Sequence, residues 1–76
     1  DEQRDRRLAA RAGAGDERAF DELVERHRAS LLRYVARRFR PELAEDAVQE
    51  ALLSAHRALI AGARPADVRA WLATIA

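Results

Sequence analysis

The sequence of 76 residues contains no cysteine, no lysine and no long run of apolar residues. Without cysteine, neither a disulfide nor a thiolate-bound metal can stabilise the fold. No segment approaches the roughly 20 apolar residues that a membrane-spanning helix requires. The first residues, DEQRDRRLAARAG, lack the apolar core of a signal peptide. These absences predict a cytoplasmic protein that does not insert into a membrane.

Glycine, proline and aromatic residues are scarce, with three, two and four copies respectively. No segment alternates polar and apolar residues, and no hairpin turn sequence occurs, so β structure has no support. A chain of this length forms one domain at most and buries only about 60% of the surface of its unfolded state. The sequence therefore predicts an all-α fold, a small bundle of three to four helices with a modest core.

Arginine supplies all 14 basic residues. Residues 1–40 hold eleven arginines and eight acids, a net charge of +3, whereas residues 41–76 hold three arginines and five acids, a net charge of −2. Arginine suits bidentate contacts to phosphates and carboxylates, but a composition rich in alanine and arginine also results from coding bias. The total of +1 neither demands nor excludes a nucleic-acid partner.

The first half of the sequence predicts a tail followed by two helical segments. Residues 1–15 mix charged with small residues, so we expect a mobile N-terminal tail. Asp16 is suited to cap a helix whose apolar face carries Phe20, Leu23, Val24 and His27. The apolar phase is interrupted at residues 27–30 and resumes at Leu31. This pattern predicts a kink or a turn, and then a second helix that ends before Pro41.

Two further helices are expected in the second half. Pro41 lacks the N–H group that the first turn of a helix leaves unpaired, so it can begin a third helix, which Gly62 terminates. A fourth helix begins at Pro65, has Asp67 in its first turn, and carries an apolar stripe of Val68, Trp71, Leu72 and Ile75. Residues 16–76 are thus expected to form one helical domain.

The predicted third helix has an unusual outer face. At about 100° per residue, its core stripe consists of Ala44, Val48, Leu52, Ala55 and Leu59. The opposite side carries acids, an amide and two branched aliphatic residues, namely Glu42, Asp46, Gln49, Glu50, Leu53, Arg57 and Ile60. Small bundles expose some apolar side chains, and another segment could cover these two. Alternatively, the face is a docking surface with an apolar centre and a polar rim, selective for an arginine-bearing helix.

Three segments in this order resemble region 2 of the bacterial RNA polymerase sigma factors of the extracytoplasmic-function (ECF) type, within the sigma-70 family. They are GDERAFDELVERHRASLLRYVARRFR (15–40), AEDAVQEALLSAHRAL (44–59) and VRAWLATIA (68–76). The most specific pieces are Glu45-Asp46-x-x-Gln49-Glu50 and RAWLATIA at residues 69–76. The aromatic cluster of primary sigma factors is absent, which favours the ECF type and a narrow set of promoters. The resemblance implies a sigma region 2 domain whose second, −35-binding domain is absent from this chain.

The resemblance implies two partners and the residues that contact them. In the family, the third helix docks on the clamp helices of the largest subunit of core RNA polymerase, and the matching positions are Asp46, Gln49, Glu50 and Leu53. The loop before the fourth helix captures a flipped base of the promoter −10 element from the non-template strand. That loop corresponds to Ala61, Gly62, Ala63, Arg64, Pro65, Ala66 and Asp67. An anti-sigma factor that covers the polymerase-binding surface is also implied as a partner.

Each of four side chains near the loop has two possible roles. Arg57, Arg64 and Arg69 contact DNA phosphates or are simply solvated. Trp71 either packs in the core or stacks on an unpaired base. Together with the loop, these residues form the predicted DNA-binding site.

An enzymatic or metal-binding function has little support. His27 and His56 lie in different predicted helices, and neither has a second histidine at a helical spacing. No glycine-rich phosphate loop occurs, and Ser30 and Ser54 have no recognisable base. We expect no catalysis, no metal and no cofactor.

Two other functions are compatible with a helical domain. A sigma-like interaction module would bind an anti-sigma factor without engaging DNA. A free-standing repressor would need a recognition helix with exposed polar residues, which the predicted fourth helix does not provide. The function that the resemblance implies is docking on polymerase, followed by recognition and melting of the −10 element.

Overall fold

Four α-helices and one short 3-10 turn make up most of the computed structural model, which describes residues 1–76 and contains no strand. The predicted all-α class is confirmed. The elements are α1 (Glu2–Gly13), α2 (Glu17–Arg38), η1 (Pro41–Leu43), α3 (Ala44–Ile60) and α4 (Val68–Ile75). None of the helices combines the length and the apolar character of a membrane span.

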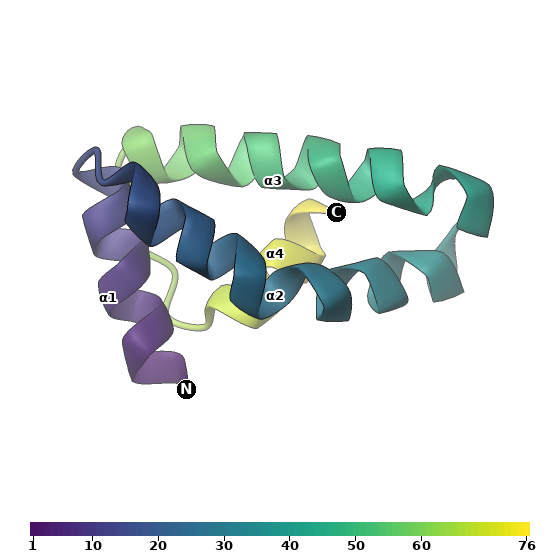
Figure 1. Ribbon diagram of the computed structural model, residues 1–76, viewed down its shortest axis with the longest axis horizontal. Helices are drawn as coiled ribbons and strands as arrows, with labels where there is room; N and C mark the ends of the chain where they lie inside the picture. Colours follow the sequence, from purple (N-terminus) through teal and green to yellow (C-terminus); the bar gives the residue numbers. More distant parts are fainter.

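Helices α2 and α3 form a long antiparallel hairpin that η1 closes at one end (Figure 1). Helix α1 crosses the other end of this hairpin, and the short α4 packs against both of its arms. The loop at residues 61–67 therefore runs from the end of α3 past α1 to the start of α4 (Figure 1). This arrangement brings the two ends of the sequence into one core.

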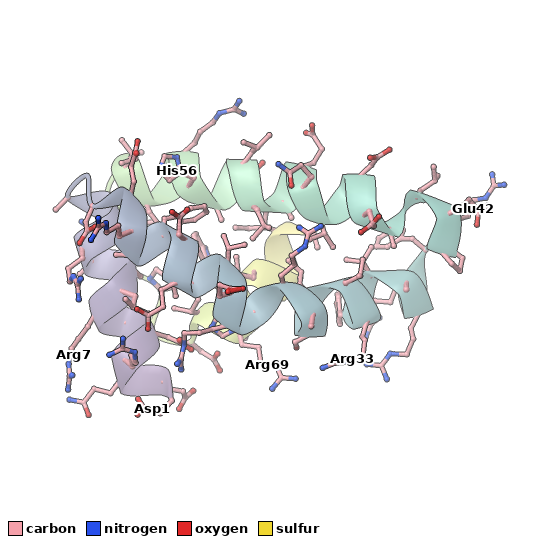
Figure 2. The ribbon with its side chains drawn as sticks, viewed as in Figure 1. Asp1, Arg7, Arg33, Glu42, His56 and Arg69 are labelled. Atoms are coloured by element: carbon pink, nitrogen blue, oxygen red, sulfur yellow. The ribbon has the colours of Figure 1, made fainter.

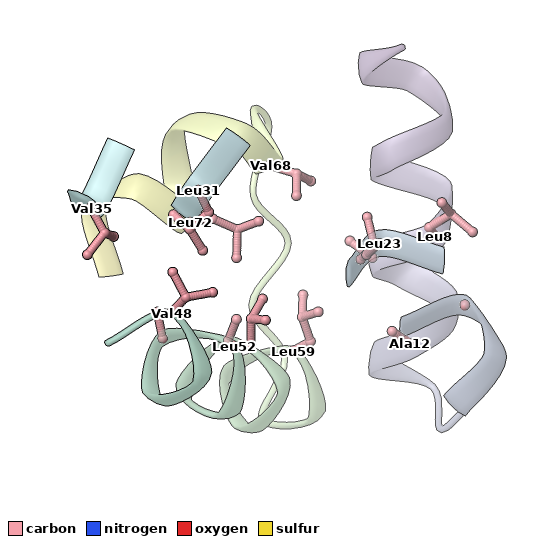
Figure 3. Packing of buried hydrophobic residues seen from close by; sticks show 14 of the residues in the cluster. Leu8, Ala12, Leu23, Leu31, Val35, Val48, Leu52, Leu59, Val68 and Leu72 are labelled. Atoms are coloured by element: carbon pink, nitrogen blue, oxygen red, sulfur yellow. The ribbon is translucent and has the colours of Figure 1, made fainter. Parts of the chain in front are cut away.

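Helix α1 occupies most of the segment that was predicted to be a mobile tail, so that prediction is wrong. Asp1 caps the helix, since its Oδ1 accepts a hydrogen bond from the Arg4 N–H at 2.8 Å. Leu8, Ala9 and Ala12 are each only 1% exposed and join the core (Figure 3). Alanine side chains let α1 approach its neighbours closely, so the small residues that suggested a tail are the ones that permit tight packing.

A buried carboxylate joins α1 to α2. Asp5 is 5% exposed, and its Oδ1 accepts a hydrogen bond from Arg26 Nε at 2.6 Å. His27 Nε2 lies 2.9 Å from Asp5 Oδ2, but it is not aligned well enough to form a hydrogen bond. Burial alone would raise the pKa of Asp5. The hydrogen bond from Arg26 and the contact with His27 outweigh it and hold that pKa below its usual value.

Helix α2 runs as one helix through residues 27–30, so the predicted turn is wrong. Its ribbon changes direction part-way along (Figure 1), which agrees with the alternative prediction of a kink. The apolar phase breaks there because His27, a buried polar residue, occupies a core position opposite Asp5. The predicted cap at the start of α2 is confirmed, because Asp16 Oδ1 accepts a hydrogen bond from the Ala19 N–H at 3.2 Å. This hydrogen bond lowers the pKa of Asp16, and Arg11 lowers it further. Partial desolvation of the carboxylate acts in the opposite direction but is outweighed, so the pKa stays below its usual value.

In the second half of the fold, the residues predicted to be buried in α3 are buried, but α3 and α4 begin at other residues than predicted. All five residues of the predicted α3 stripe are buried, and Gly62 takes a φ of 115° just after the helix, as a terminating glycine should. Pro41 begins η1 rather than α3. Helix α4 begins three residues later than predicted, because Asp67 acts as its N-cap and accepts a hydrogen bond from the Ala70 N–H at 3.1 Å.

Replacement of Asp5 by asparagine should lower the free energy of unfolding at neutral pH by about 1–3 kcal/mol. Because the folded pKa lies below the unfolded value of about 3.9, the carboxylate stabilises the fold above that value, and the stability is lost as the pH falls through the folded pKa. Urea unfolding near neutral and near acidic pH measures both effects. The variant should therefore show a flatter acid dependence than the wild type.

Asp21→Asn is the matched control for this prediction, because Asp21 is exposed and forms no ion pair. It should leave the stability nearly unchanged. If Asp5→Asn had the same stability and acid dependence as the wild type, the Asp5 carboxylate would not stabilise the packing of α1 on α2.

Candidate functional site

The outer face of α3 is exposed, as its helical projection predicted. All of its residues, including the four predicted polymerase contacts Asp46, Gln49, Glu50 and Leu53, are exposed. Leu53 is 43% exposed and Ile60 is 50% exposed, so neither α1 nor any other segment covers them. Two branched aliphatic side chains thus stand among acids and an amide on one side of the molecule.

A groove between α2 and α3 lies beside this face. Its volume is about 320 Å³. Its apolar lining is Phe20, Val24, Leu52 and Leu53, and its polar lining is Glu17, Asp21, Arg28, Gln49 and His56. Gln49 and Leu53 belong to both the groove and the outer face of α3. The outer face therefore continues into a concave surface rather than ending at a flat helix.

The contribution of α2 to this groove was missed in the sequence. Phe20 and Val24 were assigned to the core, but both are only half-buried. Their i, i+4 spacing at the edge of the apolar stripe was the available signal. His56, one of the two histidines considered as a metal ligand, packs instead against Phe20 in a tilted arrangement, with ring centroids 4.7 Å apart and an angle of 59° between the ring planes. No group of three or more histidine and carboxylate side chains is placed to hold a metal ion.

The loop at residues 61–67 lies at the end of α3 that is remote from η1 (Figure 1). Ala61, Gly62, Arg64, Ala66 and Asp67 are exposed, whereas Ala63 and Pro65 are half-buried. Two of the predicted DNA-contacting side chains already have roles within the fold: Asp67 caps α4, and Arg64 bonds to the end of α3. The loop thus presents mainly backbone and small side chains to solvent.

The three arginines around the loop differ in whether their side chains already form contacts within the domain. Arg64 Nη1 donates to the carbonyl oxygens of Leu59 at 3.1 Å and Ala63 at 2.6 Å, so it bonds one carbonyl in the last turn of α3 and one in the loop. Arg57 and Arg69 are exposed and form no ion pair. Of the three arginines predicted to contact phosphates, only Arg57 and Arg69 therefore have guanidinium groups that are available to do so.

Trp71 is half-buried and packs against the core. Its surroundings are apolar, since it lines a small cavity with residues of α2, α3 and α4, including Phe20, Leu23, Leu59 and Val68. This placement matches the core-packing interpretation and leaves only part of the side chain for contact with a base.

Comparison with known proteins identifies the family. Residues 23–76, which contain α3, the loop and α4 as well as most of α2, match the family model of sigma-70 region 2. The chain belongs to the sigma-70 region 2 family. The predicted resemblance is confirmed.

Two relatives, both named "ECF RNA polymerase sigma factor SigM", come from Mycobacterium tuberculosis. The protein of strain H37Rv is 43% identical over 72 residues, which covers 93% of this chain and 37% of the relative. The protein of strain Erdman is 44% identical over 66 residues, covering 86% and 34% respectively. The sigma region 2 domain thus spans little more than a third of the length of these relatives. No solved structure matches it.

A hollow between α2 and α4 of the sigma region 2 domain adds residues that the sequence did not single out. Its volume is about 90 Å³, and its polar lining includes Ser30, Tyr34, Arg37 and Arg69. Arg33 and Arg69 project from the same side of the domain (Figure 2). Arg33, Arg37 and Arg69 form no ion pair. Arg69 also lines a second hollow with the acids Asp1, Glu2, Asp5 and Asp67, so this side is basic at Arg33 and Arg37 and mixed in charge at Arg69. The i, i+4 spacing of Arg33 and Arg37 was the signal available in the sequence.

Proposed function

We propose that this sigma region 2 domain docks on core RNA polymerase and helps to recognise and melt the promoter −10 element in the bacterial cytoplasm. The observation that carries the proposal is the uncovered outer face of α3, where Leu53 and Ile60 stand exposed within a polar surface. Membership of the sigma-70 region 2 family supports core RNA polymerase as the partner of that face. The domain itself supplies recognition, and RNA synthesis belongs to the polymerase.

The docking residues are Asp46, Gln49, Glu50 and Leu53. Leu53 provides an apolar contact that a partner helix can cover, and the neighbouring groove between α2 and α3 has space for a side chain of that helix. The acids select a partner with arginine or lysine on the facing surface, because like-charged partners are repelled. The clamp helices of the largest polymerase subunit are the proposed partner, and an anti-sigma factor that covers the same surface would keep the domain inactive.

The proposed DNA site consists of the loop, Ala61 to Asp67, with Arg57, Arg69 and part of Trp71 around it. A single-stranded base exposes its edges and its ring face, which backbone groups and small side chains of a loop can contact. Exposed arginines without acid partners neutralise phosphates on either side of the base. The basic side of α2 and α4 extends this surface beyond the loop.

The test is binding of the domain to core RNA polymerase, followed by selection from a randomised pool of single-stranded oligonucleotides on the complex. Selective enrichment of one sequence by the complex would support both parts of the proposal. Polymerase binding without enrichment would overturn promoter reading and favour the module that binds only an anti-sigma factor. Failure to bind polymerase would overturn the docking site.

Arg69→Ala should weaken binding of the selected oligonucleotide about threefold to tenfold and reduce the slope of affinity against salt by about 0.7, the amount expected for one phosphate contact on single strands. Fluorescence anisotropy of the polymerase complex over a series of salt concentrations measures both quantities. Arg7→Ala is the control, because Arg7 is exposed, forms no ion pair and projects away from the domain (Figure 2). An unchanged slope in Arg69→Ala would remove Arg69 from the DNA site.

A further inference from the structure

We infer that α1 sets the conformation of the loop at residues 61–67, and that Arg6 and Gly13 are positioning residues for DNA recognition. The inference rests on the proposed function for the role of the loop. It adds a determinant of specificity in a helix that precedes residues 23–76, the part matched by the family model.

The first contact is a hydrogen bond between segments sixty residues apart in the sequence. Arg6 Nη1 donates to the carbonyl oxygen of Ala66 at 3.1 Å. Ala66 immediately precedes Asp67, the N-cap of α4. The contact therefore fixes the end of the loop where the backbone turns into α4.

The second contact lies at the other end of α1. The Arg64 guanidinium group lies against Gly13, where a Cβ atom would overlap it, so a larger residue at position 13 would displace the guanidinium from its present place. Gly13 has no positive φ, and its backbone conformation therefore does not require glycine. With glycine at position 13, Arg64 Nη1 reaches the carbonyl oxygens of Leu59, in the last turn of α3, and of Ala63, in the loop.

The side chains of Arg6 and Arg64 provide hydrogen bonds that the loop backbone does not form with itself. No backbone-to-backbone hydrogen bond involves Arg64, Pro65 or Ala66. Two side chains thus supply hydrogen bonds to the loop backbone. Arg6 of α1 donates to Ala66, and Arg64, whose guanidinium lies against Gly13 of α1, donates to Ala63. A loop already ordered for its ligand loses less conformational freedom on binding, which raises affinity for the base that fits it.

The first test compares two neighbouring arginines of α1. Arg6→Ala should lower the affinity of the polymerase complex for the selected oligonucleotide about threefold to tenfold, with a smaller effect on oligo(dT) of the same length. Arg7→Ala removes the same charge, but Arg7 projects away from the domain (Figure 2) and forms no ion pair or hydrogen bond, so its affinities should match the wild type. Arg6→Lys, which keeps a donor, should restore part of the discrimination. Equal losses in Arg6→Ala and Arg7→Ala would show that charge alone matters and would overturn the inference.

The second test uses a variant that should not weaken α1. Gly13→Ala improves helix propensity, so the melting temperature should stay the same or rise. The added Cβ should nevertheless displace the Arg64 guanidinium, lower the affinity for the selected oligonucleotide and loosen the loop. NMR order parameters of the Arg64, Ala66 and Asp67 amides should fall from about 0.85 toward about 0.6. Unchanged order parameters and affinity in both Gly13→Ala and Arg6→Ala would overturn the inference.

The NMR measurement separates the two levels of proposal, because it needs neither polymerase nor DNA. If the wild-type complex selects no oligonucleotide but the variants loosen the loop, the proposed promoter reading fails, although α1 still positions the loop. If selection succeeds and the variants leave the loop and its discrimination unchanged, the proposed function stands and the role of α1 is wrong.

Discussion

Replacement of Gln49 and Leu53 together by lysine is expected to lower the affinity for core RNA polymerase by about 100-fold or more. Leu53 is the apolar centre of the outer face of α3, and Gln49 lies one turn before it. Two lysines at these positions would remove the apolar contact and would place two positive charges against a partner surface that is itself expected to be positive. Both side chains are exposed. Helicity by circular dichroism should therefore remain nearly unchanged. Biolayer interferometry with the isolated clamp-helix fragment measures the affinity.

Ala10→Lys combined with Ala29→Lys is the matched control for this experiment. Both alanines are exposed, they lie on α1 and α2 rather than on α3, and the double substitution adds the same charge of +2. The control should bind the clamp-helix fragment within about threefold of the wild type. If Gln49→Lys with Leu53→Lys binds polymerase as the wild type does, the outer face of α3 is not the docking surface. A loss of helicity in the same variant would mean that the face is needed for folding.

Replacement of Leu8 by alanine should lower the free energy of unfolding by about 2–5 kcal/mol, the range for deleting a buried leucine side chain. Leu8 is 1% exposed and packs in the core with residues of the other helices (Figure 3). At about 4–8 °C per kcal/mol for a domain of this size, the melting temperature should fall by roughly 10 °C or more. Thermal unfolding followed by circular dichroism measures the shift.

The control for this prediction is Gln3→Ala, which truncates an exposed side chain on the same helix and should change the melting temperature little. A mobile tail would give the same melting temperature in Leu8→Ala, in Gln3→Ala and in the wild type. That result would contradict the packing of α1 and would also remove the basis for its role in positioning the loop.

Local patterns account for the parts of the fold that were predicted correctly. The α3 stripe of Ala44, Val48, Leu52, Ala55 and Leu59 could be projected from helical spacing, because each position depends only on its own helix. The cap at Asp16 and the terminator at Gly62 likewise act through hydrogen bonds and backbone angles of neighbouring residues. The same projection placed Asp46, Gln49, Glu50 and Leu53 on the exposed side. Their assignment to polymerase stays a prediction.

Contacts between distant segments account for the parts that were missed. Nothing in DEQRDRRLAARAG marks α1 as a core helix until Leu8 meets the other helices and Asp5 meets Arg26 and His27. His27 interrupts the apolar pattern of α2 because its partner comes from α1. The sequence left Arg64 as a phosphate contact or a solvated side chain, but two carbonyl oxygens accept hydrogen bonds from it, and the lack of a side chain on Gly13 leaves room for its guanidinium there.

The helical class, the cap at Asp16, the terminator at Gly62 and the exposed face of α3 can therefore be predicted from the amino-acid order alone, because periodicity and capping are properties of short segments. The order of three segments was also sufficient to indicate the family. The packing of α1, the continuity of α2 and the anchoring of the loop at residues 61–67 required the folded chain. Each of them depends on side chains brought together from across the sequence, up to sixty positions apart in the hydrogen bond between Arg6 and Ala66.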